Sequence, residues 1–133
     1  MREEEWESLW ADKVNISDEQ GEISSLLEWE QPLEGSCEIT HYGNQGLEIV
    51  RAGFGKIYGV RQICAGLGIS MEQVLAIGDN ENDNEMLTQA GIGAAVGNAE
   101  AATKACADLT ARKESGAGAA EIIRRICLEE NEK

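Results

Sequence analysis

The chain has 133 residues, enough for one domain, and it is 42% hydrophobic and 27% charged, which predicts a soluble globular fold. Aromatic residues make up 5% of the chain, so the core must be built from Ala, Leu, Ile and Val. The formal net charge of −14 excludes a surface that attracts nucleic acid or an anionic membrane, because both are negatively charged.

The first part of the chain, residues 1–34, is acidic, with eleven acidic and two basic residues. This charge excess predicts a solvated, partly ordered N-terminal segment, and a docking surface for a basic partner is the alternative. Short helical patterns at residues 6–13 and 23–29 are too short to form stable helices alone.

Residues 35–50 predict a β-hairpin, with strands at 36–42 and 47–50 around a turn rich in Gly and Asn. Apolar spacing then alternates between helix and strand through residues 51–133. The predicted elements are a helix at 55–67, a buried strand at 74–77, a helix at 82–89, a strand at 92–96, a helix at 99–107, an edge strand at 109–111 and a helix at 118–129. Alternation with short connections predicts an α/β fold with a parallel sheet flanked by helices.

The four cysteines form no C-x-x-C pair and have no histidine nearby, which argues against a zinc site. We expect free thiols in a reducing compartment. The sequence has no apolar run long enough to span a membrane and no signal-peptide pattern, so we expect a cytoplasmic protein.

The strongest chemical signal is the segment from Gly78 to Asp83, which follows a predicted buried strand and opens a helix. Ligands of parallel sheets bind at the carboxyl ends of the strands. Asp79 and Asp83 lie four residues apart and suit an oxygen-seeking cation such as Mg²⁺, and the amide of Asn82 is placed to donate to a phosphate oxygen. The alternative is that these side chains only cap the next helix.

A second signal is Lys56, which lies just inside the start of the predicted helix 55–67. A cation is mildly unfavourable at a helix N-terminus because it opposes the helix dipole. A phosphate bound near the metal site would neutralise that charge, whereas an ordinary surface lysine is the alternative.

These signals, in this order and spacing, resemble the haloacid dehalogenase superfamily and, within it, the Cof-type sugar-phosphatase branch. The segments that carry the resemblance are Leu47-Glu48-Ile49, Gly55-Lys56, Val74 to Asp79, Asn82-Asp83, Met86-Leu87, Ala90-Gly91, Val96 to Ala99 and Ala107 to Thr110. The match covers roughly residues 36–127. It implies that residues 51–133 are the C-terminal half of a Rossmann-like core and that the hairpin at 35–50 is the end of an α+β cap domain.

The resemblance also implies roles for individual residues. Lys56 would be both catalytic and substrate-binding, because it would steady the nucleophile and the phosphoryl group. Asp79 would bind Mg²⁺, Asp83 would support the metal site and the catalysis, Asn82 would contact the substrate phosphate, and Asn98 would shape the nearby loop. An aspartate would attack phosphorus, and water would then hydrolyse the aspartyl-phosphate.

The sequence departs from the family at the nucleophile. The family carries an Asp-x-Asp-x-Thr motif near its N-terminus, and this sequence contains no Asp-x-Asp. We therefore expect a fragment of a Mg²⁺-dependent phosphatase of small phosphorylated metabolites that is inactive on its own. A Mg²⁺- and phosphate-binding module without turnover and a structural remnant are the alternatives. A sheet cut in this way exposes an edge, so we also expect the isolated chain to form a homodimer through that edge or to be only marginally stable.

Overall fold

The computed structural model describes residues 11–17, 35–42 and 46–128. The chain divides into two compact units, residues 1–55 and residues 56–133, and each is described by itself. The helical patterns expected at 23–29 and over most of 6–13 lie outside the described residues.

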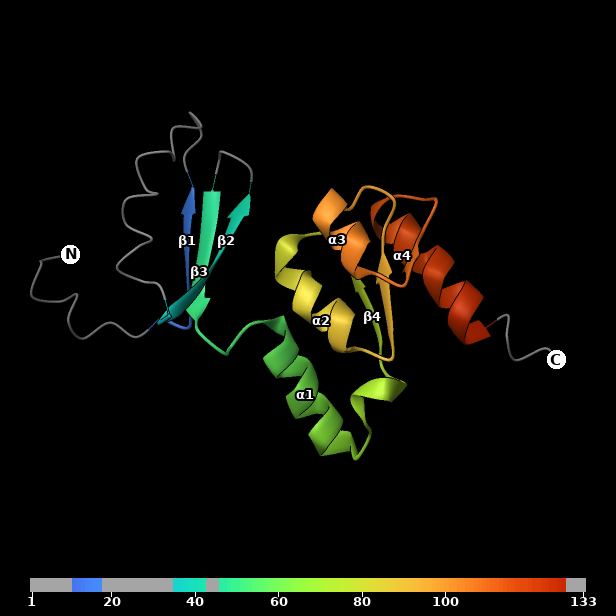
Figure 1. Cartoon of the computed structure of the whole chain (residues 1–133), viewed down its shortest axis with the longest axis horizontal. Helices are drawn as coiled ribbons and strands as arrows, with labels where there is room; N and C mark the ends of the chain where they lie inside the picture. Colours follow the sequence, from blue (N-terminus) through green and yellow to red (C-terminus); the bar gives the residue numbers. More distant parts are fainter. Residues whose placement is uncertain (1–10, 18–34, 43–45, 129–133) are drawn as a thin grey trace, which may run out of the picture. The chain divides into compact units, whose positions relative to one another are not determined.

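The first unit contains a three-stranded antiparallel sheet in the order β1-β3-β2 (Figure 1). Its strands are β1 (Lys13–Ser17), β2 (Cys37–Tyr42) and β3 (Gly46–Arg51). The central strand β3 pairs with both neighbours, so that Leu47 lies opposite Ile16 on one side and His41 on the other. Leu47 is 2% exposed and anchors the sheet.

The hairpin strands confirm the expected elements, but β1 was not predicted. Its segment Lys13–Ser17 places apolar Val14 and Ile16 at alternate positions, which is the period of a strand. The acidic residues around it obscured this signal, because a charge run indicates a solvated segment.

The second unit contains a parallel sheet in the order β4-β5-β6, which confirms the α/β fold class. The elements in chain order are α1 (Lys56–Leu67), the 3₁₀ helix η4 (Met71–Gln73), β4 (Leu75–Gly78), the 3₁₀ helix η5 (Glu81–Asp83), α2 (Asn84–Gln89), β5 (Ile92–Ala95), α3 (Ala101–Cys106), β6 (Leu109–Thr110), α4 (Ser115–Ile123) and the π-helix η6 (Arg124–Leu128). In Figure 1 the sheet lies between α2 and α3 on one side and α4 on the other.

The core of this unit is built from small and aliphatic side chains, as the composition indicates. Ala94 and Ala95 of β5 are fully buried, and Leu87 of α2 and Ile122 of α4 are each 1% exposed. Ile122 packs against Ala94 and Ala111. Small residues on the central strand let the helices approach the sheet closely, which holds the loops at the strand ends in place.

Helix α4 begins at Ser115, three residues before the predicted start. Its first residues lack apolar periodicity, and a side chain from outside the helix fixes them instead. The Oδ1 atom of Asn98 accepts a hydrogen bond from the Ser115 N–H at 2.7 Å. The carboxylate of Glu121 accepts the N–H groups of Arg112 and Lys113, which holds the preceding loop against the helix.

All four cysteines are free thiols, as expected. None of the helices in the described part of the chain is both long and apolar enough to cross a membrane.

Candidate active site

The loop that follows β4 is the centre of the candidate site. It runs from Asp79 into η5, and all of it lies in the second unit. A Cβ atom on Gly78 would lie 2.4 Å from the Cβ of Asp83 and 2.8 Å from its Oδ2. Only glycine at this position lets the Asp83 side chain fold back against the end of the strand.

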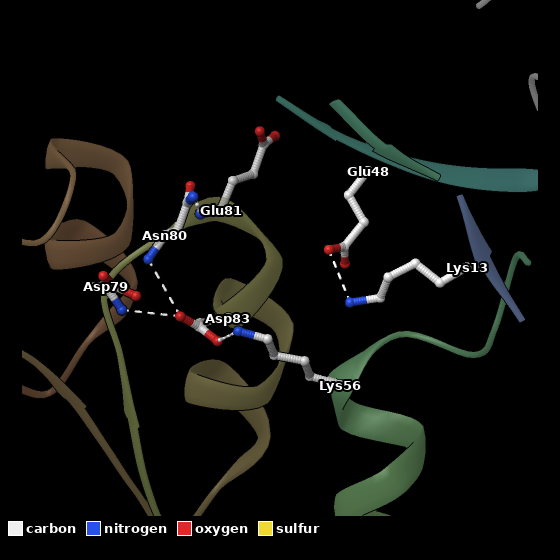
Figure 2. A network of polar contacts seen from close by, with 7 residues as sticks. All are labelled: Lys13, Glu48, Lys56, Asp79, Asn80, Glu81 and Asp83. Carbon is white, nitrogen blue, oxygen red and sulfur yellow. Dashed lines mark hydrogen bonds and ion pairs between the residues drawn. The ribbon is translucent and has the colours of Figure 1, made fainter. Parts of the chain in front are cut away.

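Asp83 is 3% exposed and accepts hydrogen bonds from three donors (Figure 2). Its Oδ2 accepts the N–H of Asp79 at 2.9 Å and the N–H of Asn80 at 3.3 Å. Its Oδ1 lies 2.5 Å from the Nζ of Lys56. The two backbone bonds fold the loop into a tight turn, and the third bond joins the loop to α1.

Burial raises the pKa of Asp83, because a buried carboxylate loses hydration. The hydrogen bonds from Lys56, Asp79 and Asn80 and the positive charge of Lys56 outweigh burial and hold that pKa below its ordinary value of 3.8. The side chain is therefore ionised at neutral pH.

Lys56 is the first residue of α1, and its side chain is 49% exposed. Its ammonium contacts the buried carboxylate of Asp83, as Figure 2 shows. This arrangement leaves donor capacity on Nζ for an anion, because an ammonium carries three N–H bonds.

Asp79 occupies the mouth of the loop, and its side chain is exposed. Its backbone is fixed on both sides, since its N–H donates to Asp83 and its C=O accepts the N–H of Glu100 at 3.0 Å. A pocket of about 310 Å³ opens beside it, lined by Ile77, Gly78, Asp79, Val96, Ser115, Gly116 and Ala119. The carboxylate of Asp79 is thus available to a ligand at the carboxyl end of β4.

The chain is similar to known proteins in sequence and in structure. A model of haloacid dehalogenase-like hydrolases matches residues 2–123 of the chain. The chain belongs to this family. The structure of a protein described as a HAD/COF-like hydrolase from Plasmodium vivax superposes with a TM-score of 0.80 at 27% identity, covering 96% of this chain and 46% of that one. A haloacid dehalogenase-like hydrolase from Bacteroides thetaiotaomicron superposes with a TM-score of 0.69 at 31% identity, over 89% and 45% of the two chains.

Similar sequences carry several names. A phosphoglycolate phosphatase of Aeropyrum pernix is 40% identical over 85 residues, which are 64% of this chain and 36% of that protein. A chloroplastic endoribonuclease YBEY of Arabidopsis thaliana is 35% identical over 118 residues, which are 87% of this chain but 20% of that protein. The chain therefore spans less than half the length of each of these relatives.

The structure brings the predicted site residues of this family member together at one end of β4. Lys56 contacts Asp83, Asp79 donates its N–H to the same carboxylate, and Asn82 lies between the two acids in the sequence. The Oδ1 atom of Asn82 is buried and has no hydrogen-bond partner among the described residues. This amide oxygen is an acceptor, so it suits a donor or a cation, whereas only the amide N–H groups of Asn82 could donate to a phosphate oxygen.

The helix-capping alternative holds for part of the motif. Asn80 is the N-cap of η5, and Asp83 completes a capping box by accepting the Asn80 N–H. The role of Asn80 was not predicted, although the spacing of Asn80 and Asp83 is the signal of such a box. Asp79 does not cap the helix, so its exposed carboxylate has no such structural task. Asn98 shapes the adjoining loop through Ser115, as expected.

The candidate Mg²⁺ ligands form an incomplete set within the described residues. No group of three or more His, Cys, Asp and Glu side chains that could hold a metal ion occurs in the part of the chain that the structure describes. The exposed carboxylate of Asp79 fits a hard cation, whereas both oxygens of Asp83 already accept hydrogen bonds. The residues present thus fit one side of a Mg²⁺ site.

The pH dependence of stability tests the contacts of Asp83. The contribution of these contacts to the free energy of unfolding is fully present above 3.8, the pKa of Asp83 in the unfolded chain. It is lost as the pH falls through the lower pKa of Asp83 in the folded chain. In urea titrations, Asp83→Asn should lower the free energy of unfolding at neutral pH by about 1–3 kcal/mol and flatten its fall between about pH 5 and pH 2.

The control is Glu81→Gln, an exposed acid of the same loop, which should leave both the stability and its pH dependence near those of the unaltered chain. If the free energy of unfolding of Asp83→Asn decreased with falling pH as steeply as that of the unaltered chain, the stabilising role of the ionised Asp83 side chain would be contradicted.

Proposed function

We propose that this chain forms one side of the active site of a Mg²⁺-dependent phosphatase that hydrolyses small phosphorylated, sugar-phosphate-like metabolites. The contact between Lys56 and Asp83 carries the proposal, because it places a half-exposed ammonium at the carboxyl end of β4. Asp79 lies on the same loop, so an anion-binding group and a cation-binding group lie at one strand end.

In the proposed site Lys56 binds a phosphate oxygen, and Asp83 holds the ammonium in place. Asn82 supplies a further polar contact to the phosphate, and Asp79 holds Mg²⁺ with Asp83 as its support. When bound, Mg²⁺ supplies charge neutralisation for the phosphoryl group. The need is large here, because the chain carries a net charge of −14, which repels phosphate.

The attacking group must come from outside these 133 residues, since they contain no Asp-x-Asp. In a covalent mechanism the aspartate forms a bond to phosphorus as the ester oxygen leaves, and water then displaces the aspartate to release phosphate. We therefore propose that the chain alone has no turnover. Similar proteins named as phosphatases of phosphoglycolate and of 5-amino-6-(5-phospho-D-ribitylamino)uracil support a phosphorylated small molecule as the substrate class.

A binding module without turnover is the second candidate, and the same missing motif favours it. In that case Lys56, Asn82 and Asp79 would still hold phosphate and Mg²⁺. A structural remnant would bind neither. A cytoplasmic location is part of the proposal and is supported by the four free thiols.

Calorimetric titration with Mg²⁺ in the presence of inorganic phosphate separates the two functions that bind these ions from the structural remnant. The unaltered chain should bind both, and Asp79→Asn should remove the Mg²⁺ signal because it removes the exposed carboxylate charge. Glu72→Gln is the matched control, since Glu72 is an exposed acid in η4, before the amino end of β4, and it should bind Mg²⁺ as the unaltered chain does.

Equal Mg²⁺ binding by Asp79→Asn would rule out Asp79 as a ligand, and no binding by the unaltered chain would leave the structural remnant. Hydrolysis of a phosphate monoester by the purified chain alone would overturn the assignment of the nucleophile to another segment.

We also propose that the isolated chain forms a homodimer through the outer edge of β4. Among the described residues β4 pairs with β5 alone, and an unpaired edge offers N–H and C=O groups to another strand. Leu75 and Ile77 of β4 are half-buried and pack against the core of the second unit. Sedimentation of the unaltered chain should show a dimer that dissociates on dilution, and Leu75→Lys should shift it toward monomer. A monomer at all concentrations would sink the proposal.

A further inference from the structure

The loop that follows β5 bonds to two residues that line the pocket at the candidate site. This loop comprises residues 96–100 and lies wholly in the second unit. The N–H of Glu100 donates to the C=O of Asp79 at 3.0 Å. The Oδ1 atom of Asn98 accepts the N–H of Ser115 at 2.7 Å. Asp79 and Ser115 both line the pocket, so one short loop connects two of its residues.

The backbone of the loop is closed into a turn. The N–H of Ala99 donates to the C=O of Val96 at 3.0 Å, and both residues are buried in one cluster with Ala95. Asn98 and Glu100 lie on either side of Ala99 in the sequence. A shift of the backbone at Asn98 is therefore passed to Glu100 through a single residue.

The start of α4 needs the bond from Asn98. Ser115 has φ of +48°, a left-handed conformation that is unfavourable for a residue with a side chain. The Asn98 oxygen accepts its N–H at 2.7 Å and lies 3.5 Å from its hydroxyl oxygen, which holds Ser115 in that conformation. Beside it, the N–H of Gly97 donates to the C=O of Lys113 at 2.8 Å. The loop and the start of α4 are thus fixed to each other at neighbouring residues.

We propose that Asn98 is a positioning residue for Asp79. Its side chain holds the loop after β5 against the start of α4, and the loop in turn holds the Asp79 carbonyl through the Glu100 N–H. The Asp79 backbone then keeps one conformation, from which the exposed carboxylate meets a cation. The consequence for Mg²⁺ binding rests on the proposed function, whereas the hydrogen bonds do not.

Three variants test the Asn98 side chain. Asn98→Ala removes the acceptor, whereas Asn98→Asp keeps an acceptor oxygen and should preserve the hydrogen bond. Ser115→Gly combined with Asn98→Ala places a glycine at position 115, and glycine adopts the left-handed conformation without strain. This double variant should therefore recover part of what Asn98→Ala loses.

The matched control is Asp108→Ala. The Oδ2 atom of Asp108 accepts the N–H of Gly93 at 2.8 Å, which is a bond of the same kind near the amino end of β5. Neither residue lines the pocket. A general loosening of the fold would appear in both Asn98→Ala and Asp108→Ala, whereas a loss of positioning would appear in Asn98→Ala alone.

Hydrogen exchange of the Glu100 amide, followed by NMR on the whole chain, reports the bond to Asp79. Its rate is taken relative to the slowest amides of the same sample, which report global unfolding. Asn98→Ala should raise this relative rate by about two- to tenfold, the factor that one hydrogen bond represents. Asn98→Ala should also weaken Mg²⁺ binding by about fivefold, the lower end of coupling between sites. Asp108→Ala should change neither quantity.

If Asn98→Ala exposed the Ser115 amide and left exchange at Glu100 unchanged, Asn98 would only cap α4 and the positioning role would be overturned. Faster exchange at Glu100 with unchanged Mg²⁺ affinity, or equal effects of Asp108→Ala, would overturn it as well. If the unaltered chain binds no Mg²⁺, the proposed function fails, and exchange at Glu100 still decides the role of Asn98.

Discussion

The candidate site depends on one buried carboxylate, that of Asp83, which has lost its hydration. Asp83 is 3% exposed, and an unpaired charge there would be costly. The chain satisfies it with two backbone N–H groups of its own loop and the ammonium of Lys56. Meeting that requirement closes the loop after β4, leaves the Asp79 side chain facing solvent and joins the loop to α1. Gly78 makes the arrangement sterically feasible.

The resulting half-site carries groups that can bind phosphate and a cation, although the sequence contains no Asp-x-Asp. It offers an ammonium, which suits phosphate, together with an exposed carboxylate and the buried amide oxygen of Asn82, which suit a hard cation. It offers no complete set of metal ligands within the described residues. A strand added to the free edge of β4 in the parallel sense would end beside these groups. Among the described residues, the unpaired edge of β4 and the incomplete set of metal ligands thus belong to the same strand and the loop that follows it.

Much of the second unit could be predicted because its signals are local. The short apolar runs at β4 and β5 and the Gly-Asp that follows β4 indicated a parallel sheet with a site at its strand ends. The start of α4 could not be predicted, since its first N–H bonds to Asn98, 17 residues away in the sequence. The different tasks of Asp79 and Asp83 were also hidden, because burial separates these two acids and their sequence context does not. The hydrogen bond from the Gly53 N–H to the Glu38 carboxylate joins residues 15 apart in the sequence, so it could not be predicted either.

The coupling between Lys56 and Asp83 tests the central claim most directly. A double-mutant cycle with Lys56→Met and Asp83→Asn, measured as free energies of unfolding in urea at neutral pH, isolates the interaction of the two side chains. Half-exposure of the Lys56 side chain places the expected coupling toward the lower end of the range for contacting residues, about 0.5–1 kcal/mol, and salt should reduce it. Effects that add to within about 0.3 kcal/mol would contradict the account, because α1 and the loop would then be independent.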